Sequence, residues 1–476
     1  MSHSALLTIA VAGVATLLLL ILKAKVQPFV ALVVVSVGVA LAAGVPAADL
    51  VKTIEDGMGA TLGHIATIIA LGAMIGRIVE LSGGAHAFAY ALIEKFGSRR
   101  TPLALTVAGF VLGIPVFFEV GLIILMPIAY GVARASRKPL LVYALPMGAA
   151  MLTVHAFLPP HPGAVAVAAT IGASQGLMLL LGLPVTAVVA LVGFLVSRRL
   201  TRREYPMDPA VRAEVYGEPE AGSGAGSSEP TVSDGGHATA VLTRPAPSGT
   251  EVRPPSFGMV LALIVTPILL ILLGTISQNT LAEGSALRGV LTVLGAPMVA
   301  LLIDVALCGW LLGARRGWDR SRIAEVMGSA LPPVAMVILV AGAGGVFGKV
   351  LVAGGIGDAI ADVLERTGLP VLLLAFLTSL ALRAAQGSAT VALITTAGIL
   401  TPLLHRADLS TAQLSLVALA MGAGALALSH INDAGYWMFT KLAGLDVASG
   451  LRTWTVLTTV MGCTGFALTA ALWPLV

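Results

Sequence analysis

The sequence predicts an all-helical integral membrane protein made of two inverted-topology repeats, each with a re-entrant helical hairpin and a broken transmembrane helix. Hydrophobic residues make up 57% of the 476 residues and charged residues 11%, with a mean hydropathy of +0.96. Soluble domains carry about 25% charged residues. The apolar runs are about 17 to 25 residues long, which is the length of a membrane-spanning helix. The chain is therefore expected to lie in a lipid bilayer.

A short motif that occurs twice indicates an internal duplication. Residues 144–149 read ALPMGA and are followed by His155, while residues 418–423 read ALAMGA and are followed by His430. In membrane proteins, such repeats are typical of secondary transporters whose substrate site lies between the halves.

The first transmembrane repeat is expected over residues 1–200. Residues 102–133 are too long for one span, are interrupted by Gly113-Ile-Pro115, and are flanked on both sides by basic residues that favour the cytoplasm. We therefore expect a re-entrant hairpin there, with its tip in the middle of the membrane. The other elements are helices at 5–22, 26–44 and 60–81, an amphipathic piece at 85–96, a broken helix over 139–183 and a return helix ending at Arg198.

Residues 201–256 are rich in Pro, Gly, Ser and Glu and lack the apolar residues that an ordered core needs. This composition predicts a disordered linker between the repeats. The basic cluster at 197–203 places the linker in the cytoplasm. With five crossings in each repeat, both termini are then expected outside.

An odd number of crossings requires the second repeat, residues 257–476, to run upside down relative to the first. Its elements are expected in the same order: helices at 257–276, 289–313 and 331–352, an amphipathic piece at 356–366, a hairpin at 370–404, a broken helix over 411–444 and a final helix from Trp454. The hairpin tip reads QGSAT, and the broken helix is interrupted at SHINDAG. Two opposed tips are therefore expected to meet near the membrane midplane.

Ionisable side chains inside apolar segments cost about 2.5 to 3.5 kcal/mol on insertion scales and are candidates for function. Here they gather at the tips and breaks. The candidates for proton coupling are Glu119, Asp433, His155, His161 and His430. By contrast, Arg77 and Glu80 have i, i+3 spacing, which favours a structural pair.

The tips and breaks also predict a site for a small anion, because half-helix N-termini favour a carboxylate. Arg383 can pair with a carboxylate, and Ser388, Thr390 and Asn432 can bind hydroxyl groups. The candidates for substrate binding are Arg383, Gln386, Gly387, Ser388, Thr390, Asn432, Gly113, Pro115 and Phe118.

No nucleophile triad, metal cluster or cofactor fingerprint occurs in the sequence, which argues against an enzyme and predicts no catalytic residue, metal or cofactor other than a coupling ion. Cys308 and Cys463 lie in separate apolar helices without metal or redox spacing. The net charge of +4 reflects basic loops that orient the helices, and no nucleic-acid partner is expected.

Four motifs resemble the signature regions of the gluconate:proton symporter (GntP) family: GFVLGIPVFFEVGLIILMPIAYGVAR, PMGAAMLTVHAFLPPHPG, RAAQGSATVALITTAGI and SHINDAGYWMFTKLAGL. The resemblance implies a secondary transporter of the bacterial inner membrane that takes up gluconate, a related sugar acid or a small hydroxy acid with protons. Similarity to the wider ion-transporter superfamily implies a homodimer with elevator-like movement of the hairpins. Family members often have Asp where this chain has Glu119, so the carboxylate is retained on a longer side chain.

Two alternatives remain open at this stage. Sodium could be the coupling ion, because tips with Ser388, Thr390 and backbone carbonyls also resemble the sodium-binding loops of related carboxylate transporters. An uncoupled anion channel or a receptor would show no accumulation of substrate against a gradient.

Overall fold

The structure of the chain, a computed structural model, describes residues 2–216, 254–356, 359, 369–431 and 433–476. Every named element in these ranges is a helix. Within them, nine helical stretches are long and apolar enough to cross a membrane. The all-helical membrane fold predicted from composition is confirmed, whereas Asn432 and most of the piece at 356–366 lie outside the described residues.

The first repeat contains the predicted types of element. Its helices are α1 (His3–Leu22), α2 (Pro28–Ala42), α3 (Ala47–Leu81), α4 (Gly84–Phe96), α5 (Thr101–Leu112), α6 (Phe118–Ser136), α7 (Leu141–Phe157), α8 (Pro162–Ile171) and α9 (Gln175–Leu200). Helices α5 and α6 form the hairpin, and we call residues 113–117 between them tip 1. Helices α7 and α8 form the broken helix, and residues 158–161 are break 1.

Two boundaries in this repeat differ from those read in the sequence. Helix α3 begins at Ala47, well before residue 60, and has 35 residues. The broken helix ends at Ile171, not at 183, because the Ser174 side chain accepts a hydrogen bond from the Leu177 N–H and starts α9 as a separate helix.

The second repeat contains α11 (Phe257–Thr280), α12 (Ala286–Leu294), α13 (Pro297–Cys308), α14 (Arg320–Ser329), α15 (Leu331–Ala353), α17 (Val371–Gln386), α18 (Ala389–Arg406), α19 (Thr411–Leu426), α20 (Ala434–Leu442), α21 (Val447–Gly450) and α22 (Val456–Leu472). The helix expected at 289–313 is divided by Gly295 and Ala296, and Pro297 starts the new helix. Residues 387–388 between α17 and α18 are tip 2, and residues 427–433 are break 2. A π-helical turn, Leu451–Thr455, joins α21 to α22.

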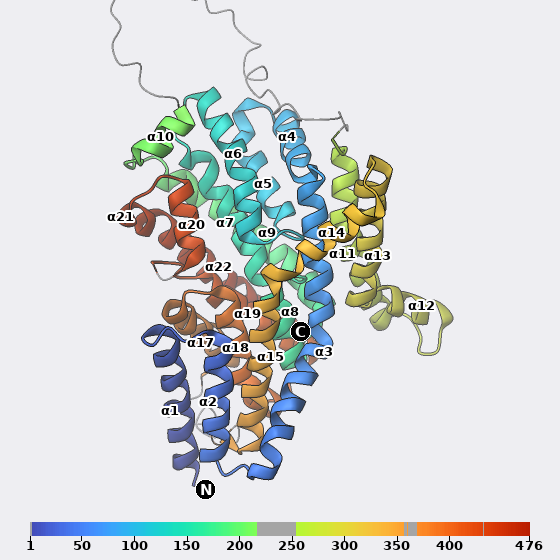
Figure 1. Cartoon of the computed structure of the whole chain (residues 1–476), viewed down its shortest axis with the longest axis vertical. Helices are drawn as coiled ribbons and strands as arrows, with labels where there is room; N and C mark the ends of the chain where they lie inside the picture. The colour runs from blue at the N-terminus through green and yellow to red at the C-terminus, as the bar shows by residue number, and fades with distance from the viewer. Residues whose placement is uncertain (1, 217–253, 357–358, 360–368, 432) are drawn as a thin grey trace, which may run out of the picture.

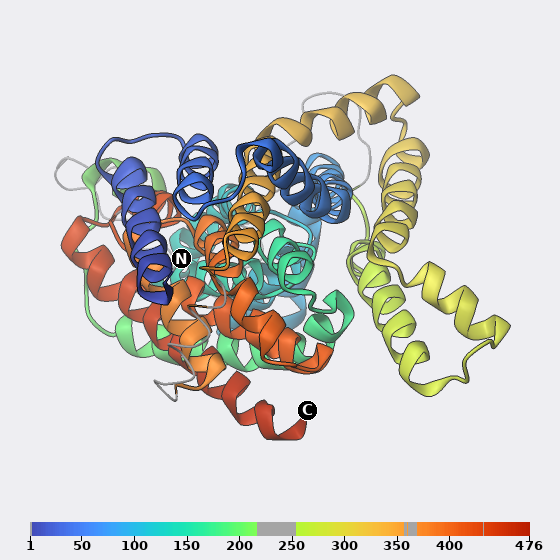
Figure 2. The same cartoon turned by 90° about the horizontal axis from the view of Figure 1, so that it is seen from below.

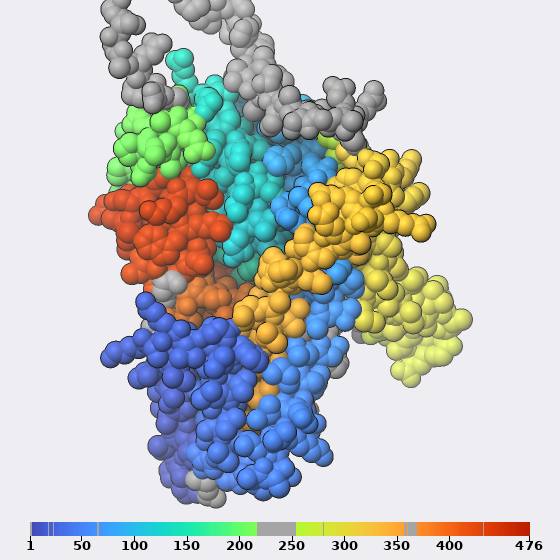
Figure 3. Space-filling model, viewed as in Figure 1, coloured from blue at the N-terminus to red at the C-terminus, as the bar shows by residue number. Residues whose placement is uncertain are grey.

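Part of the segment predicted as a linker is helical. Residues Pro209–Tyr216 form α10, which lies at the end of the molecule opposite the N-terminus (Figure 1). The Arg134 guanidinium of α6 donates hydrogen bonds to the carbonyls of Val215 and Glu214. Close by, Met207 pairs with Leu445 through a backbone bridge, so that α10 lies beside the segment after α20 (Figure 3). Residues 217–253 lie outside the described residues.

The two repeats interlock through α3 and α15. A methyl group at Gly57 of α3 would lie 2.8 Å from the Cα atom of Val346, so these helices touch at their backbones. Helices α11, α12 and α13 stand to one side of the remaining bundle (Figure 2). The elements around the tips therefore form the centre of the molecule.

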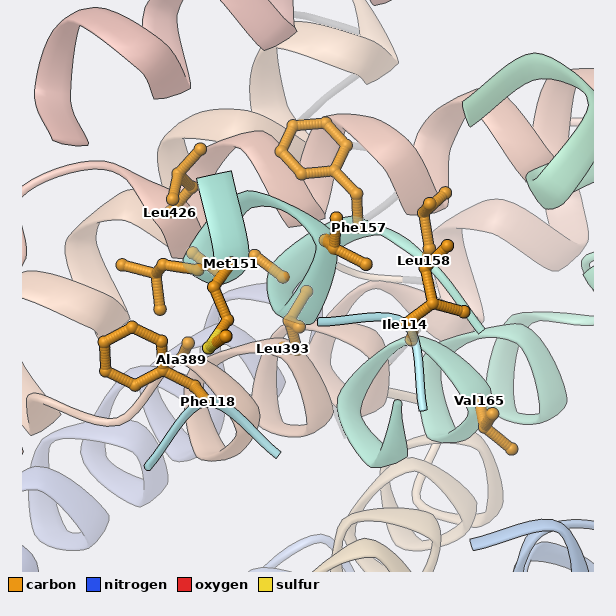
Figure 4. Packing of buried hydrophobic residues seen from close by; sticks show 14 of the residues in the cluster. Ile114, Phe118, Met151, Phe157, Leu158, Val165, Ala389, Leu393 and Leu426 are labelled. Atoms are coloured by element: carbon orange, nitrogen blue, oxygen red, sulfur yellow. The ribbon is translucent and has the colours of Figure 1, made fainter. Parts of the chain in front are cut away.

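The centre is filled by hydrophobic side chains from both repeats (Figure 4). Ile114, Phe118 and Met151 come from the first repeat, and Leu393 and Leu426 come from the second. All five are buried. This packing holds the tips and breaks of the two repeats in contact.

Candidate functional site

A cavity of about 550 Å³ lies where tip 1 and tip 2 meet. Ligand sites in proteins are typically about 300 to 1,000 Å³ in volume. The lining comes from both repeats: Pro28, Ala73, Gly76, Arg77, Glu80, Val116, Phe117, Glu119, Val120, His155, Pro162, Ser329, Ala330, Pro333, Met336, Val337, Val340, Ser388, Thr390 and Val391. The cavity is therefore the candidate substrate site.

The residues of tip 2 are organised around Arg383. Its guanidinium is buried and donates hydrogen bonds to the Gly387 carbonyl and to the Asp433 carboxylate. Gly387 has a φ of +78°, which a residue with a side chain rarely adopts, and its carbonyl can thereby turn back toward α17. The Nε atom of Arg383 has no hydrogen-bond partner among the described residues. Arg383 thus ties tip 2 to break 2.

Break 2 is closed by a network around Asp433. Besides Arg383, its carboxylate accepts hydrogen bonds from the Ser429 hydroxyl and, at 2.9 Å, from the Gly435 N–H. The Trp454 indole N–H donates to the Ser429 oxygen at 2.8 Å. The charge of Asp433 is therefore compensated inside the second repeat.

Two histidines lie next to each other in the first repeat. The His161 Nε2–H donates to the Gly113 carbonyl and fastens break 1 to tip 1. The His155 and His161 rings are 4.6 Å apart, and His155 lines the cavity. The His155 Nδ1 atom has no hydrogen-bond partner in the described part of the chain. The third histidine, His430, donates from Nε2 to the Ala384 carbonyl at 3.0 Å.

Glu119 lies in the first turn of α6 and lines the cavity. It forms no salt bridge with any described residue. Across the cavity, the Ser388 hydroxyl accepts a hydrogen bond from the Val391 N–H at 3.3 Å and caps α18, and Thr390 also lines the wall. Glu119 is thus a carboxylate that faces the cavity without a cation paired to it in the described residues.

Four of the predicted site residues line the cavity: Glu119, His155, Ser388 and Thr390. The others described lie around it in the surrounding layer of the tips and breaks: Gly113, Pro115, Phe118, His161, Arg383, Gln386, Gly387, His430 and Asp433. The Gln386 amide is buried, and neither its nitrogen nor its oxygen has a partner among the described residues.

One polar group of the cavity wall, formed by Arg77, Glu80 and Ser329, was not predicted from the sequence. Arg77 and Glu80 form the expected i, i+3 salt bridge, with 2.8 Å between Nη1 and Oε1, and the Arg77 Nε–H donates to the Ser329 hydroxyl at 3.1 Å. All three residues line the cavity. Their i, i+3 spacing indicated the pair, but it could not indicate which neighbours this face of α3 meets.

No group of three or more His, Cys, Asp or Glu side chains in the described ranges could hold a metal ion. The polar chemistry of the cavity comes instead from one Arg–Glu pair, one unpaired carboxylate, one histidine and several hydroxyls.

Comparisons with known proteins agree with this architecture. The family model described as GntP family permease matches residues 5–223 and 238–476. The inner membrane permease YgbN of Escherichia coli K12 is 47% identical over 476 residues, which cover 100% of both chains. The gluconate permease of Bacillus licheniformis is 35% identical over 471 residues, 98% of this chain and 99% of that protein. The crystal structure of the YdaH transporter of Alcanivorax borkumensis has a TM-score of 0.59 at 15% identity, covering 94% of this chain and 98% of that one, and shows a shared fold.

Proposed function

The chain belongs to the GntP permease family, and from that premise we propose that it imports gluconate or a related sugar acid by proton symport. It is a multi-pass transport protein of the inner membrane. The proposal concerns the substrate, the coupling ion and the movement that carries the substrate across.

The starts of three helices at the cavity support an anionic substrate. Helix α6 begins at Phe118, α8 at Pro162 and α18 at Ala389, and residues at all three starts line the cavity. A helix N-terminus has unpaired N–H groups and a partial positive charge, which favour a carboxylate. The Ser329, Ser388 and Thr390 hydroxyls can bind the hydroxyl groups of a sugar acid. The name of the Bacillus licheniformis relative supports gluconate as the type of substrate.

The position of Glu119 is the single observation that carries proton coupling. An ionised Glu119 shares the cavity with the bound carboxylate, and two negative charges in one partly dry cavity repel each other. Binding of a proton to Glu119 removes this repulsion, so proton and anion bind together more tightly than either binds alone. Such mutual stabilisation of two ligands is what symport requires.

The proposed movement is elevator-like and takes place in a homodimer, as the resemblance to the superfamily implies. Two tips that enter the centre from opposite sides, as expected for inverted repeats, would suit a site that opens alternately to the two sides. The proposed orientation has the segment after α9 in the cytoplasm, because residues 197–203 form a dense basic cluster.

Uptake of radiolabelled gluconate into proteoliposomes tests the function. A pH gradient, acidic outside, is expected to drive accumulation of gluconate without sodium. Accumulation that requires sodium and ignores the pH gradient would identify a sodium-coupled transporter, and equilibration without accumulation would identify an uncoupled channel.

Thermal unfolding of the purified protein with a panel of sugar acids tests the substrate. A true substrate binds the folded state and raises the unfolding temperature with its concentration. The expected result is stabilisation by gluconate or a close relative and none by a neutral sugar alcohol of the same length.

A further inference from the structure

Asp304 is a buried carboxyl group that belongs to no part of the site described above. It lies in the middle of the apolar helix α13 and is 0% exposed. Its Oδ1 atom has no hydrogen-bond partner among the described residues, and its Oδ2 atom meets the Cys308 thiol at 3.9 Å. It forms no salt bridge in the described part of the chain. An ionised carboxylate is very poorly stabilised in such a place.

Asp304 lines a second, small cavity of about 20 Å³. This volume has room for one water molecule, which needs about 10 to 15 Å³. The other lining residues are Gly72, Ile75, Ile114, Pro115, Pro159, Pro160, Leu179, Ile264, Pro267, Ile268, Ile271 and Leu301. Asp304 is the one ionisable residue among these lining residues. The small cavity therefore joins α13 to the elements of tip 1 and break 1.

No described side chain on the elements packed around Asp304 forms an ion pair with it. Helix α11 carries no titratable residue. On α3, Arg77 is paired with Glu80 and faces the large cavity. At break 1, His161 is bonded to the Gly113 carbonyl.

Only a thin wall separates the small cavity from the substrate cavity. Gly72 and Ile75 of α3 line the small cavity, while Ala73 and Gly76 line the large one. A methyl group at Gly76 would lie 2.4 Å from the carbonyl oxygen of Pro115, so α3 touches the backbone of tip 1 directly. A change in the position of tip 1 against α3 would therefore alter both cavities together.

The acid can be compared with the residue at the same distance from the start of a proline-initiated helix in the first repeat. Helices α2 and α13 both begin with a proline, Pro28 and Pro297. Asp304 lies 304 − 297 = 7 residues after Pro297, and the residue 7 positions after Pro28, at 28 + 7 = 35, is the buried Val35. A valine side chain can be buried in an apolar helix without any polar partner, whereas an aspartate cannot. An ionisable residue inside a membrane helix is by default a candidate for function.

We infer that Asp304 is a second proton-binding site of the transport cycle, held as the neutral acid in the conformation seen here. The inference rests on the proposed function, because it assigns a proton to the same cycle. In this step the carboxylate takes one proton from a hydronium ion, forming an O–H bond and leaving water, and it later returns that proton to a water molecule when movement of tip 1 hydrates the small cavity. Because Asp304 lies outside the substrate cavity, its proton does not compete with the substrate for space.

Infrared spectroscopy of the purified protein tests the protonation without any transport. Protein labelled with ¹³C-aspartate is expected to show an isotope-shifted carboxylic-acid C=O band, and this band is expected to be absent from Asp304→Asn. Cys308→Ala, which removes the thiol but keeps the acid, should retain the band with a small shift. A band that is missing from the wild type, or that persists in Asp304→Asn, would overturn the inference.

Reversal potentials in proteoliposomes test the place of this proton in the cycle. The number of protons carried per substrate is expected to fall by one in Asp304→Asn, while Cys308→Ala keeps the wild-type number. An unchanged number in Asp304→Asn would refute the role in transport even if the infrared band is present. If the wild type carries no protons with its substrate, the proposed symport fails instead, and the infrared band still reports whether Asp304 is protonated.

Discussion

The two hairpin tips occupy corresponding places in the repeats, yet their ionisable groups serve different purposes. Beside tip 2, Arg383 of α17 and Asp433 of break 2 are buried and bound to each other. Beside tip 1, Glu119 of α6 and His155 of α7 line the cavity, and Glu119 has no cation paired with it in the described residues. Around its tip, the second repeat therefore uses its charged pair to hold a shape, whereas the first repeat presents Glu119 and His155 to the substrate site.

This difference shows how the two copies of a duplicated scaffold can take on different roles, one structural and one in ligand binding. Both copies keep the tip and the break, because each copy must build half of the pathway. Once one copy holds the geometry with a compensated ion pair, the other copy can keep a carboxylate whose protonation changes. Three substitutions test this division, and we take them in order of expected effect.

Arg383→Ala is expected to have the largest effect, because it leaves Asp433 buried without its partner. Breaking one half of a buried ion pair costs about 3 to 5 kcal/mol. The unfolding temperature in detergent should fall strongly, and the double variant Arg383→Met with Asp433→Asn should recover most of the loss. A single variant that unfolds at the wild-type temperature but no longer binds substrate would instead make Arg383 a substrate contact, as the sequence suggested.

His161→Phe is expected to have an intermediate effect on stability. It leaves the buried Gly113 carbonyl without the histidine N–H, and an unsatisfied buried acceptor costs about 1 to 3 kcal/mol. His430→Phe is the matched control in the second repeat, where the Ala384 carbonyl is only half-buried and water can replace the ring. Equal losses in free energy of unfolding for the two variants would contradict the expectation that the buried Gly113 carbonyl depends more on its histidine than the half-buried Ala384 carbonyl does.

Glu119→Gln is expected to have the smallest effect on stability, because glutamine keeps the size of the side chain and removes a carboxylate that has no salt-bridge partner among the described residues. Its effect should appear in coupling. Wild-type affinity for gluconate should fall as pH rises, because Glu119 loses the proton that removes its repulsion of the anion. The variant should bind gluconate with an affinity that does not depend on pH. A coupling free energy of about 1 to 3 kcal/mol corresponds to a change of about 5- to 150-fold in affinity.

Glu119→Asp is the control, since it keeps the carboxylate and should keep the pH dependence. Affinity measured by titration calorimetry over a range of pH values separates the variants. A Glu119→Gln protein that keeps the wild-type pH dependence would show that another group binds the coupling proton.

The fold could be predicted from the sequence because each of its elements is marked by a pattern in neighbouring residues. Long apolar runs mark the helices, and Gly-Ile-Pro at tip 1 and the prolines at break 1 mark interruptions that show directly in the chain. The same local signals led to Glu119, His155, Ser388 and Thr390, all of which line the cavity.

The pairings across the site could not be predicted in this way. The contact of Arg383 with Asp433 joins two positions 50 residues apart, and neither segment carries a sign of its partner. Asp304 was not predicted because it lies in the middle of α13, away from the tips and breaks at which the other candidate residues gather. The place of Arg77 in the cavity wall depends on which helices pack beside α3, which is decided by the tertiary fold.

The contacts of Trp454 have a consequence for the order of biosynthesis. Its ring lies 5.9 Å from that of Phe118 beside tip 1 and stacks on Phe439 at 4.3 Å, and its N–H reaches Ser429 at break 2. Trp454 follows Phe118 by 454 − 118 = 336 residues. Because the chain is synthesised from its N-terminus, tip 1 lacks this contact until the second repeat has been made through Trp454, and a chain truncated before residue 454 would lack a finished site however well its earlier helices had inserted.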